Sequence, residues 1–217
     1  RLAKCAFISK NGKRYFEEKY PSAVTSYNPL GSKDYGYGPC KSSDNVLRVV
    51  SCSDVYPLKR VPLLFEALNS AVDLEIEWTH IGDGPHFNEL KSMGQNQRKK
   101  HLTVNLLGAL EHNLVMEHYK DHQFDVFVNL STNEGVPVSI MEAISFNIPV
   151  VATNVGGTSD VVPEDVGELI SPNPTKEEII NSITAVVAKK MSPRDFWLTH
   201  YNAAVNYNAF VSLLKSI

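Results

Sequence analysis

The feature that most constrains the fold of this chain is a regular alternation of apolar, β-branched segments with segments of helical periodicity between residues 46 and 189. Strands are expected at 46–52, 74–81, 102–107, 124–130, 149–153 and 168–170, and helices at 60–71, from 85 onward, and at 111–119, 138–145 and 175–189. Strands that alternate with helices form a parallel sheet, and right-handed crossovers cover both of its faces. We therefore expect an α/β fold with a Rossmann-like, doubly wound parallel sheet, and a ligand site at the carboxyl ends of its strands.

The segments that flank this alternation have a different character. Residues 2–8 read as a short strand, and a helix capped by Ser9 or Asn11 is expected to follow as far as Glu18. Residues 27–45 are rich in Gly, Pro, Ser and Tyr, which predicts a linker and a domain boundary near residue 44. A last helix is expected over 194–215, with Trp197, Tyr201, Tyr207 and Phe210 recurring at helical spacing. We divide the chain into 1–44, 45–190 and 191–217. Because 2–8 reads as a core strand at the very start, we also expect residues upstream to be missing.

The composition excludes some classes of protein. With a net charge of −3, nothing in the chain calls for a polyanionic partner, so no nucleic acid is expected. The cysteines, Cys5, Cys40 and Cys52, are few and lack metal-ligand spacing. Cys5 and Cys52 lie in strand-like runs and are expected in the core, which fits a reducing compartment. No apolar run reaches the roughly 20 residues of a membrane-spanning helix.

The loop after the expected strand 124–130 carries the most chemistry. Gly135 allows close backbone approach to a ligand, and Pro137 suits the first turn of the helix that follows. A helix N-terminus carries about half a positive charge and free N–H groups, which favour phosphate. Glu134 and Glu142 flank this N-terminus and could accept hydrogen bonds from sugar or ribose hydroxyls. Spacing alone equally allows a cap and a solvated helix residue.

Further motifs occur in a fixed order along the chain. The glutamate pair is separated by seven residues, with Gly after the first and Ala after the second. A Gly-Asp-Gly-Pro turn stands at 82–85, a strand with a glycine turn at 148–157, and a strand with a basic loop at 50–61. Together they resemble the large family of retaining GT-B glycosyltransferases, group 1, over residues 45–190. The resemblance implies that this chain is the C-terminal, nucleotide-sugar-binding half of a GT-B fold, of the kind found in bacterial enzymes of surface-polysaccharide synthesis.

The resemblance also implies roles for the residues of the glutamate loop. Glu142 would bind the ribose hydroxyls of the nucleotide, and Glu134 would meet the donor sugar. The backbone of Gly135, Val136 and Pro137 would line the sugar and the diphosphate, with Val138 beside the diphosphate and ribose.

A second group of roles concerns the phosphates and the base. Lys59 would reach the diphosphate and neutralise the charge of the leaving group. Gly108, Ala109 and Leu110 would hold the base. The family usually carries an arginine at the position of Asp54, whose charge would repel the diphosphate. Arg60 is a candidate substitute, although adjacent residues at a helix start cannot face the same way.

The implied reaction transfers a sugar, hexosyl or N-acetylhexosaminyl, from a nucleotide diphosphate donor with retention of configuration. UDP-sugar is the expected donor and GDP-sugar the second choice. A saccharide or lipid-linked acceptor in O-antigen or capsule synthesis is expected, with no cofactor and no metal. The location implied is cytoplasmic, or peripheral on the inner face of the plasma membrane. The 217 residues alone are expected to be inactive. Two alternatives remain: a GT-B-type sugar-nucleotide epimerase and a non-catalytic nucleotide-sugar-binding module.

Three histidines and a basic run are interpreted conservatively. His118 and His122 have the i, i+4 spacing of a metal pair but lack an acidic or Cys companion, so they and His112 are expected on a solvated face. The run 98–101 is expected to be a solvated helix end.

Overall fold

The computed structural model describes residues 4–38, 44–97 and 99–215, and its centre is a six-stranded parallel sheet. The strands are β3 (Val46–Cys52), β4 (Glu75–Ile81), β5 (Leu102–Leu106), β6 (Val126–Asn129), β7 (Val150–Thr153) and β8 (Gly167–Ile170). Their order in the sheet is β5-β4-β3-β6-β7-β8. This is the order of a doubly wound nucleotide-binding sheet, and the winding reverses between β3 and β6.

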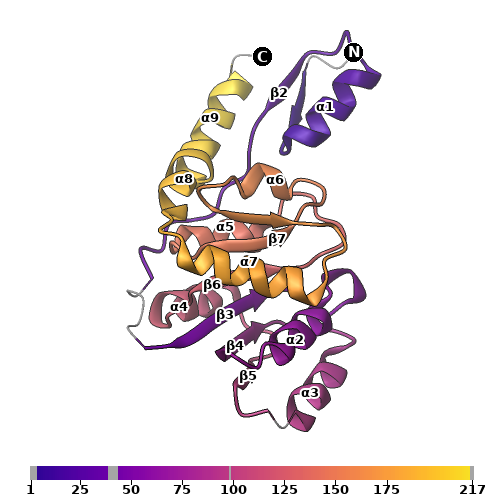
Figure 1. Cartoon of the computed structure of the whole chain (residues 1–217). Coiled ribbons are helices and arrows are strands. Elements are labelled where there is room, and N and C mark those ends of the chain that lie inside the picture. The colour runs from indigo at the N-terminus through magenta and orange to yellow at the C-terminus, as the bar shows by residue number, and fades with distance from the viewer. Residues whose placement is uncertain (1–3, 39–43, 98, 216–217) are drawn as a thin grey trace.

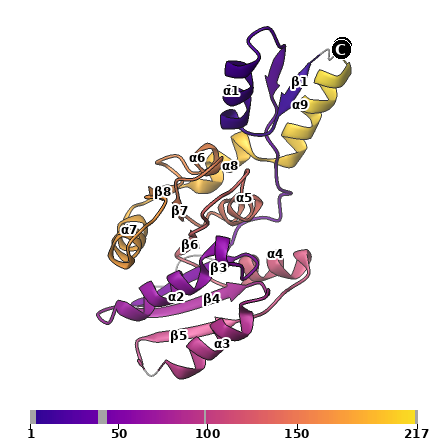
Figure 2. The same ribbon diagram turned by 90° about the vertical axis from the view of Figure 1, so that its right-hand side faces the viewer.

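Helices cover both faces of this sheet (Figures 1 and 2). One face carries α2 (Val61–Ser70), α3 (Phe87–Asn96) and α7 (Lys176–Ala188), and the other carries α4 (His112–Asp121), α5 (Val138–Ser145) and α8 (Pro193–His200). The apolar side chains form two cores because neighbouring strand residues point to opposite faces. Val49 and Val151 pack in the core under α2 and α7, whereas Val50 and Val150 pack in the core under α4 and α5.

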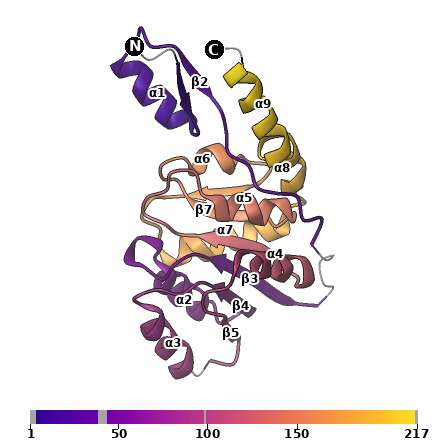
Figure 3. The ribbon, with the colours of Figure 1, turned by 180° about the vertical axis from the view of Figure 1, so that it is seen from behind.

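The N-terminal segment forms a small layer of its own. It consists of β1 (Cys5–Phe7), α1 (Lys10–Lys19) and β2 (Thr25–Tyr27), and its two strands pair in parallel. The Ser9 side chain accepts a hydrogen bond from the Gly12 backbone N–H, which confirms the expected cap. The prediction missed β2, which begins before the expected linker. Figure 3 shows this layer beside the end of the chain, above the large sheet.

Few polar contacts join this layer to the rest of the described chain. The Lys10 backbone N–H donates to the Asp160 carboxylate at 2.7 Å. Outside the layer, the Tyr201 hydroxyl donates to the carbonyl oxygen of the same Asp160 at 2.7 Å. The hydroxyls of Tyr27 and Tyr201 lie 3.5 Å apart. Asp160 belongs to α6 (Thr158–Val161), a single turn that the sequence did not predict.

The expected last helix is broken into α8 and α9 (Ala203–Lys215), so the prediction of one helix was wrong. The linker causes the break: the Ser32 N–H donates to the Tyr201 carbonyl, and the Ala203 N–H donates to the Ser32 carbonyl. Trp197 and Tyr201 pack in the core, whereas Tyr207 and Phe210 are 53% and 37% exposed. The aromatic stripe therefore divides at the break.

Both described cysteines differ from expectation. Cys5 and Cys52 are only partly buried, because β1 belongs to the small layer and Cys52 lies at the carboxyl end of the central strand β3, where it still packs against the core under α4 and α5. The start of the expected strand 2–8, Cys40 with residues 39–43 of the linker, and Arg98 of the basic run lie outside the described residues. Within the described ranges, no helix is long and apolar enough to cross a membrane.

Candidate active site

The loops that follow β3 and β6 meet at the point where the winding of the sheet reverses. Lys59 ends a short 3-10 turn, η1 (Pro57–Lys59), after β3, and Glu134 lies in the loop after β6. The Lys59 Nζ lies 2.7 Å from Glu134 Oε1. The Thr132 backbone N–H donates to the Leu58 carbonyl at 2.8 Å, which ties the two loops together. The structure thus brings together two residues that are distant in the sequence and were both predicted for the site.

The Glu134 carboxylate is held in its charged form. Only 11% of its side chain is exposed, and burial by itself raises the pKa of a carboxyl. Hydrogen bonds from Lys59 and from Asn129 Nδ2, at 3.2 Å, together with the Lys59 charge outweigh this burial, so the pKa of Glu134 is lowered. The site therefore carries a fixed, compensated ion pair at neutral pH.

The glycine turn after β7 fits against the backbone of the Glu134 loop. Gly156 has φ +54°, and a Cβ on it would lie 1.8 Å from the Glu134 carbonyl oxygen. A Cβ on Gly157 would lie 2.1 Å from the Gly135 carbonyl oxygen, and the Gly157 N–H donates to the Glu134 carbonyl. The sequence indicated a turn here but not that the turn supports the Glu134 loop.

Gly156→Ala should lower the free energy of unfolding by about 2 kcal/mol, because alanine is strained at this φ and its Cβ collides with rigid backbone. Urea unfolding measures the change. Gly135→Ala is the matched control, since a Cβ at Gly135 meets nothing within 4 Å. Wild-type stability of Gly156→Ala would contradict the close fit.

The N-terminus of α5 opens onto the same place. Its N-cap is Pro137, which makes no side-chain capping bond, so the first N–H groups of the helix remain available for an anion. Gly135 and Val138 are exposed, whereas the side chains of Val136 and Pro137 are buried. Gly135, Val136 and Pro137 lie in the loop that leads into α5, and their roles at the donor stay predictions.

Glu142 lies one turn into α5 and is buried, with 9% of the residue exposed. Its Oε1 lies 2.9 Å from His112 Nε2, at the start of α4. Burial raises the pKa of Glu142, and the hydrogen bond and charge of His112 offset only part of that effect. Sequence reasoning placed His112 on a solvated face and missed this pair. The available signal was its position two residues after the expected base loop.

The expected base loop lies at the carboxyl ends of β4 and β5. The Gly82 N–H donates to the Gly108 carbonyl at 2.8 Å, so the loops after these strands are bridged. Gly108 has φ +72°, a conformation that glycine adopts readily. Ala109 is exposed and Leu110 packs partly into the core.

Arg60 points away from the Lys59–Glu134 pair. Its backbone is left-handed, and its guanidinium donates to the carbonyl oxygens of Leu130, Ser131 and Pro172. These bonds fasten the start of α2 to the ends of β6 and β8. The structure therefore does not bring the Arg60 guanidinium to the Lys59–Glu134 ion pair. Asp54 lies exposed in the loop after β3.

A cavity of about 790 Å³ lies between α1 and the loop after β7. Its lining includes Lys10, Lys13, Arg14, Tyr27, Asn154 and Gly156. Gly156 also touches the Glu134 backbone, so this cavity adjoins the candidate site.

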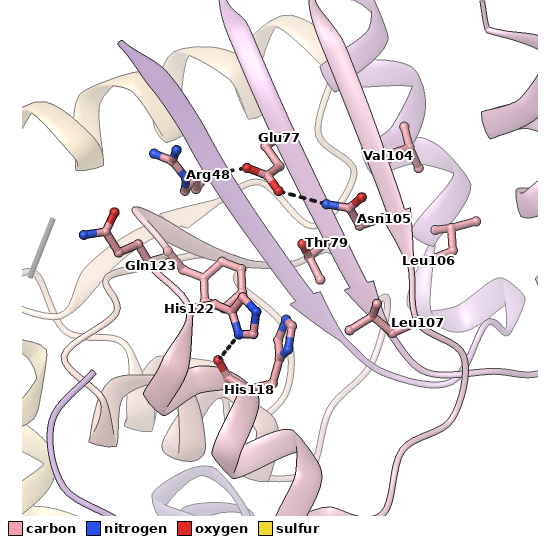
Figure 4. A pocket seen from close by; sticks show the side chains of 11 residues that line it. Arg48, Glu77, Thr79, Val104, Asn105, Leu106, Leu107, His118, His122 and Gln123 are labelled. Carbon is pink, nitrogen blue, oxygen red and sulfur yellow. Dashed lines mark hydrogen bonds and ion pairs between the residues drawn. The ribbon is translucent and has the colours of Figure 1, made fainter. Parts of the chain in front are cut away.

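A second cavity, of about 540 Å³, lies on the face of β3, β4 and β5 rather than at their carboxyl ends (Figure 4). Glu77 bridges Arg48 and Asn105, at 3.5 Å and 2.9 Å. The rings of His118 and His122 stack with centroids 3.9 Å apart. Among the described residues, no group of three or more His, Cys, Asp or Glu side chains could hold a metal ion.

Comparison with known proteins identifies the sequence pattern. Residues 41–198 match the family described as glycosyl transferases group 1. A phosphatidylinositol N-acetylglucosaminyltransferase subunit of Arabidopsis thaliana is 28% identical over 153 residues, which are 68% of this chain and 32% of that protein. The chain thus spans about a third of the length of the curated relatives it matches.

Solved structures share the architecture. The lipopolysaccharide outer core galactosyltransferase WaaB has a TM-score of 0.80 at 19% identity, over 98% of this chain and 62% of that one. Anabaena Alr3699/HepE, solved in complex with UDP, has a TM-score of 0.77 at 18% identity, over 98% of this chain and 63% of that one. At these identities the likeness shows the fold, and the predicted half of a GT-B fold is confirmed.

Proposed function

Because this chain belongs to the glycosyl transferases group 1 family, we propose that it forms the nucleotide-sugar-binding part of a retaining glycosyltransferase. The observation that carries the proposal is the Lys59–Glu134 ion pair beside the uncapped N-terminus of α5, with Glu142 on the same helix. A cation and free N–H groups suit a diphosphate, and carboxylates suit hydroxyls. Few other ligands combine both features as a nucleotide sugar does.

In the proposed reaction, the bond from the anomeric carbon to the β-phosphate oxygen breaks, and a bond to an acceptor hydroxyl oxygen forms on the same face of the sugar. The hydroxyl proton passes to the departing diphosphate. Lys59 and the N–H groups of α5 hold the negative charge that grows on the diphosphate. Glu134 positions the sugar hydroxyls, and Glu142 positions the ribose.

Lys59 and α5 supply the charge neutralisation that a divalent cation gives elsewhere, so the proposal includes no metal and no cofactor. Asp54 lowers the affinity for the diphosphate in this scheme, and Arg60 serves to hold the loops rather than the phosphates. Gly108, Ala109 and Leu110 form the base pocket.

UDP is the proposed nucleotide, since Anabaena Alr3699/HepE was solved with UDP. The transferred sugar is a hexosyl or N-acetylhexosaminyl group, and the second kind is supported by relatives named as N-acetylglucosaminyltransferases. The acceptor is a saccharide or a lipid-linked molecule. The phosphatidylinositol in those names supports the lipid-linked kind, while O-antigen or capsule synthesis stays a prediction.

The domain scheme of 1–44, 45–190 and 191–217, with the last helix packing towards an N-terminal half, stays part of the proposal. So do a cytoplasmic location, or a peripheral one at the inner face of the plasma membrane, and inactivity of these 217 residues on their own. Among the alternatives, an epimerase would act on the nucleotide sugar without an acceptor. A non-catalytic module would bind it without turnover in any longer form of the protein.

Titration calorimetry tests the proposal directly. We expect UDP to bind more tightly than GDP or ADP, and Glu142→Ala to weaken UDP binding by about tenfold or more, because two ribose hydroxyls lose a charged acceptor. Glu178→Ala is the control, since that half-buried carboxylate bonds to Ser171 at the end of β8, away from the site. Equal binding of UDP by wild type and Glu142→Ala would refute the assigned ribose site.

A further inference from the structure

His112 stands at the first position of α4 and reaches across to α5. Its Nε2 lies 2.9 Å from Glu142 Oε1, and a carboxylate can only accept there, so Nε2 carries the proton and donates. The His112 side chain is 58% exposed, whereas the Glu142 side chain is 12% exposed. The pair thus joins an open site to a carboxylate embedded in the core.

Two other potential donors, the Cys52 thiol and the Tyr119 hydroxyl, lie near Glu142, but the structure shows neither bonded to its carboxylate. Burial is the main influence on the pKa of Glu142. Among the described residues, the side chain that the structure shows hydrogen-bonded to the Glu142 carboxylate is that of His112. Without that donor, a nearly buried carboxylate would lose its orientation and part of its charge.

The imidazole is itself held in place. The Tyr35 ring meets it edge-on with centroids 6.1 Å apart, and Tyr35 in turn stacks on Phe146. Its backbone is fixed as the first residue of a helix. A ring fixed on these sides presents its Nε2 proton in one direction.

We propose that His112 is a positioning residue that fixes the Glu142 carboxylate for the ribose hydroxyls and so sets the preference for a ribonucleotide over a deoxyribonucleotide. This inference rests on the proposed function, in which Glu142 binds the ribose. One oxygen of Glu142 accepts the hydrogen bond from His112 Nε2–H, which leaves the other oxygen oriented for the nucleotide.

The test compares the dissociation constants of UDP and 2′-deoxy-UDP by calorimetry, for the wild type, His112→Gln and His112→Asn. The glutamine amide nitrogen is as many bonds from the backbone as Nε2, whereas that of asparagine is one bond shorter. We expect the wild type to prefer UDP by about tenfold, the worth of one good hydrogen bond to a charged group. His112→Gln should keep most of this preference. His112→Asn should reduce it to about twofold by weakening UDP alone.

The outcomes separate the inference from its premise. A wild-type preference that persists in His112→Asn would overturn the positioning role, as would an equal loss of both ligands, which indicates general damage to the fold. A wild type that binds both nucleotides equally would instead overturn the ribose role of Glu142. Thermal unfolding of each variant checks that the fold is kept.

Discussion

Lys59→Ala should weaken the binding of UDP by about tenfold or more and leave the binding of uridine nearly unchanged. The Lys59 ammonium is the cation of the candidate site, and hydrogen bonds between ammonium and phosphate are among the strong ones. Uridine has no phosphate, so its binding does not depend on the Lys59 ammonium. In the absence of ligand, the variant also leaves the Glu134 carboxylate, whose side chain is only 11% exposed, without its partner at 2.7 Å, which adds negative potential where the diphosphate should lie.

Calorimetry with UDP and uridine gives the ratio of their dissociation constants, and this ratio tests whether Lys59 binds the diphosphate. Lys176→Ala is the matched control, because this substitution removes the same charge. Lys176 forms a surface ion pair with Glu66, between α7 and α2. If UDP and uridine weaken to the same extent, Lys59 acts only by shaping the loop. A higher salt concentration should narrow the difference in UDP affinity between the wild type and Lys59→Ala, since screening weakens contacts between charged side chains and phosphate.

Arg194→Met should lower the free energy of unfolding by about 2–3 kcal/mol, because buried acceptors lose their donor, although the Asp34 carboxylate left behind is 41% exposed and partly solvated. The Arg194 side chain is 6% exposed and forms a double hydrogen bond with the Asp34 carboxylate at 2.7 and 2.9 Å. It also donates to the carbonyl oxygens of Gly36 and Ser145. One guanidinium therefore fastens the linker and the end of α5 to α8, and all three acceptors lose their partner together.

Urea unfolding monitored by tryptophan fluorescence measures this change. Arg14→Met is the control, because Arg14 is exposed and bonds to Asn11 on the same helix. A loss of less than about 1 kcal/mol, the range of surface pairs, would contradict the anchoring role.

The same pair predicts a pH dependence. Burial raises the pKa of Asp34, but the Arg194 hydrogen bonds and the Gly36 N–H outweigh it, so the pKa lies below the ordinary value of 3.8. A carboxyl whose folded pKa is depressed stabilises the protein above its unfolded pKa and loses that contribution as the pH falls through the folded value. Stability should therefore fall below about pH 4, and less steeply in Asp34→Asn.

Local signals explain why the sheet could be predicted from the sequence. The expected strand 46–52 coincides with β3, and the helix expected at 138–145 coincides with α5, because apolar periodicity and flanking breakers mark both segments. The winding order follows from the alternation of strands and helices. Since ligands of such sheets bind at the carboxyl ends, the loop containing Glu134 could also be identified.

What the sequence could not predict depends on contacts between distant segments. His112 meets Glu142 only because α4 and α5 are neighbours on one face, and 30 residues separate the two side chains. Helical periodicity continues through 194–215, yet Ser32 interrupts the helix from the far end of the chain. In the sequence, Arg194 is an ordinary charged residue at the start of a helix. Its ion pair with Asp34 forms only because the folded linker brings Asp34 beside α8.

The small N-terminal layer is attached to the rest of the described chain by few polar contacts. Within the described residues, its polar links to the rest of the fold are the Lys10–Asp160 hydrogen bond, worth about 1 kcal/mol net, and a weaker 3.5 Å contact between the hydroxyls of Tyr27 and Tyr201. Separating the layer from the sheet would break these two links, and no residue of β1, α1 or β2 belongs to either core of the sheet. The energy needed to separate the layer from the loop containing Gly156 is therefore small compared with that of unfolding the sheet.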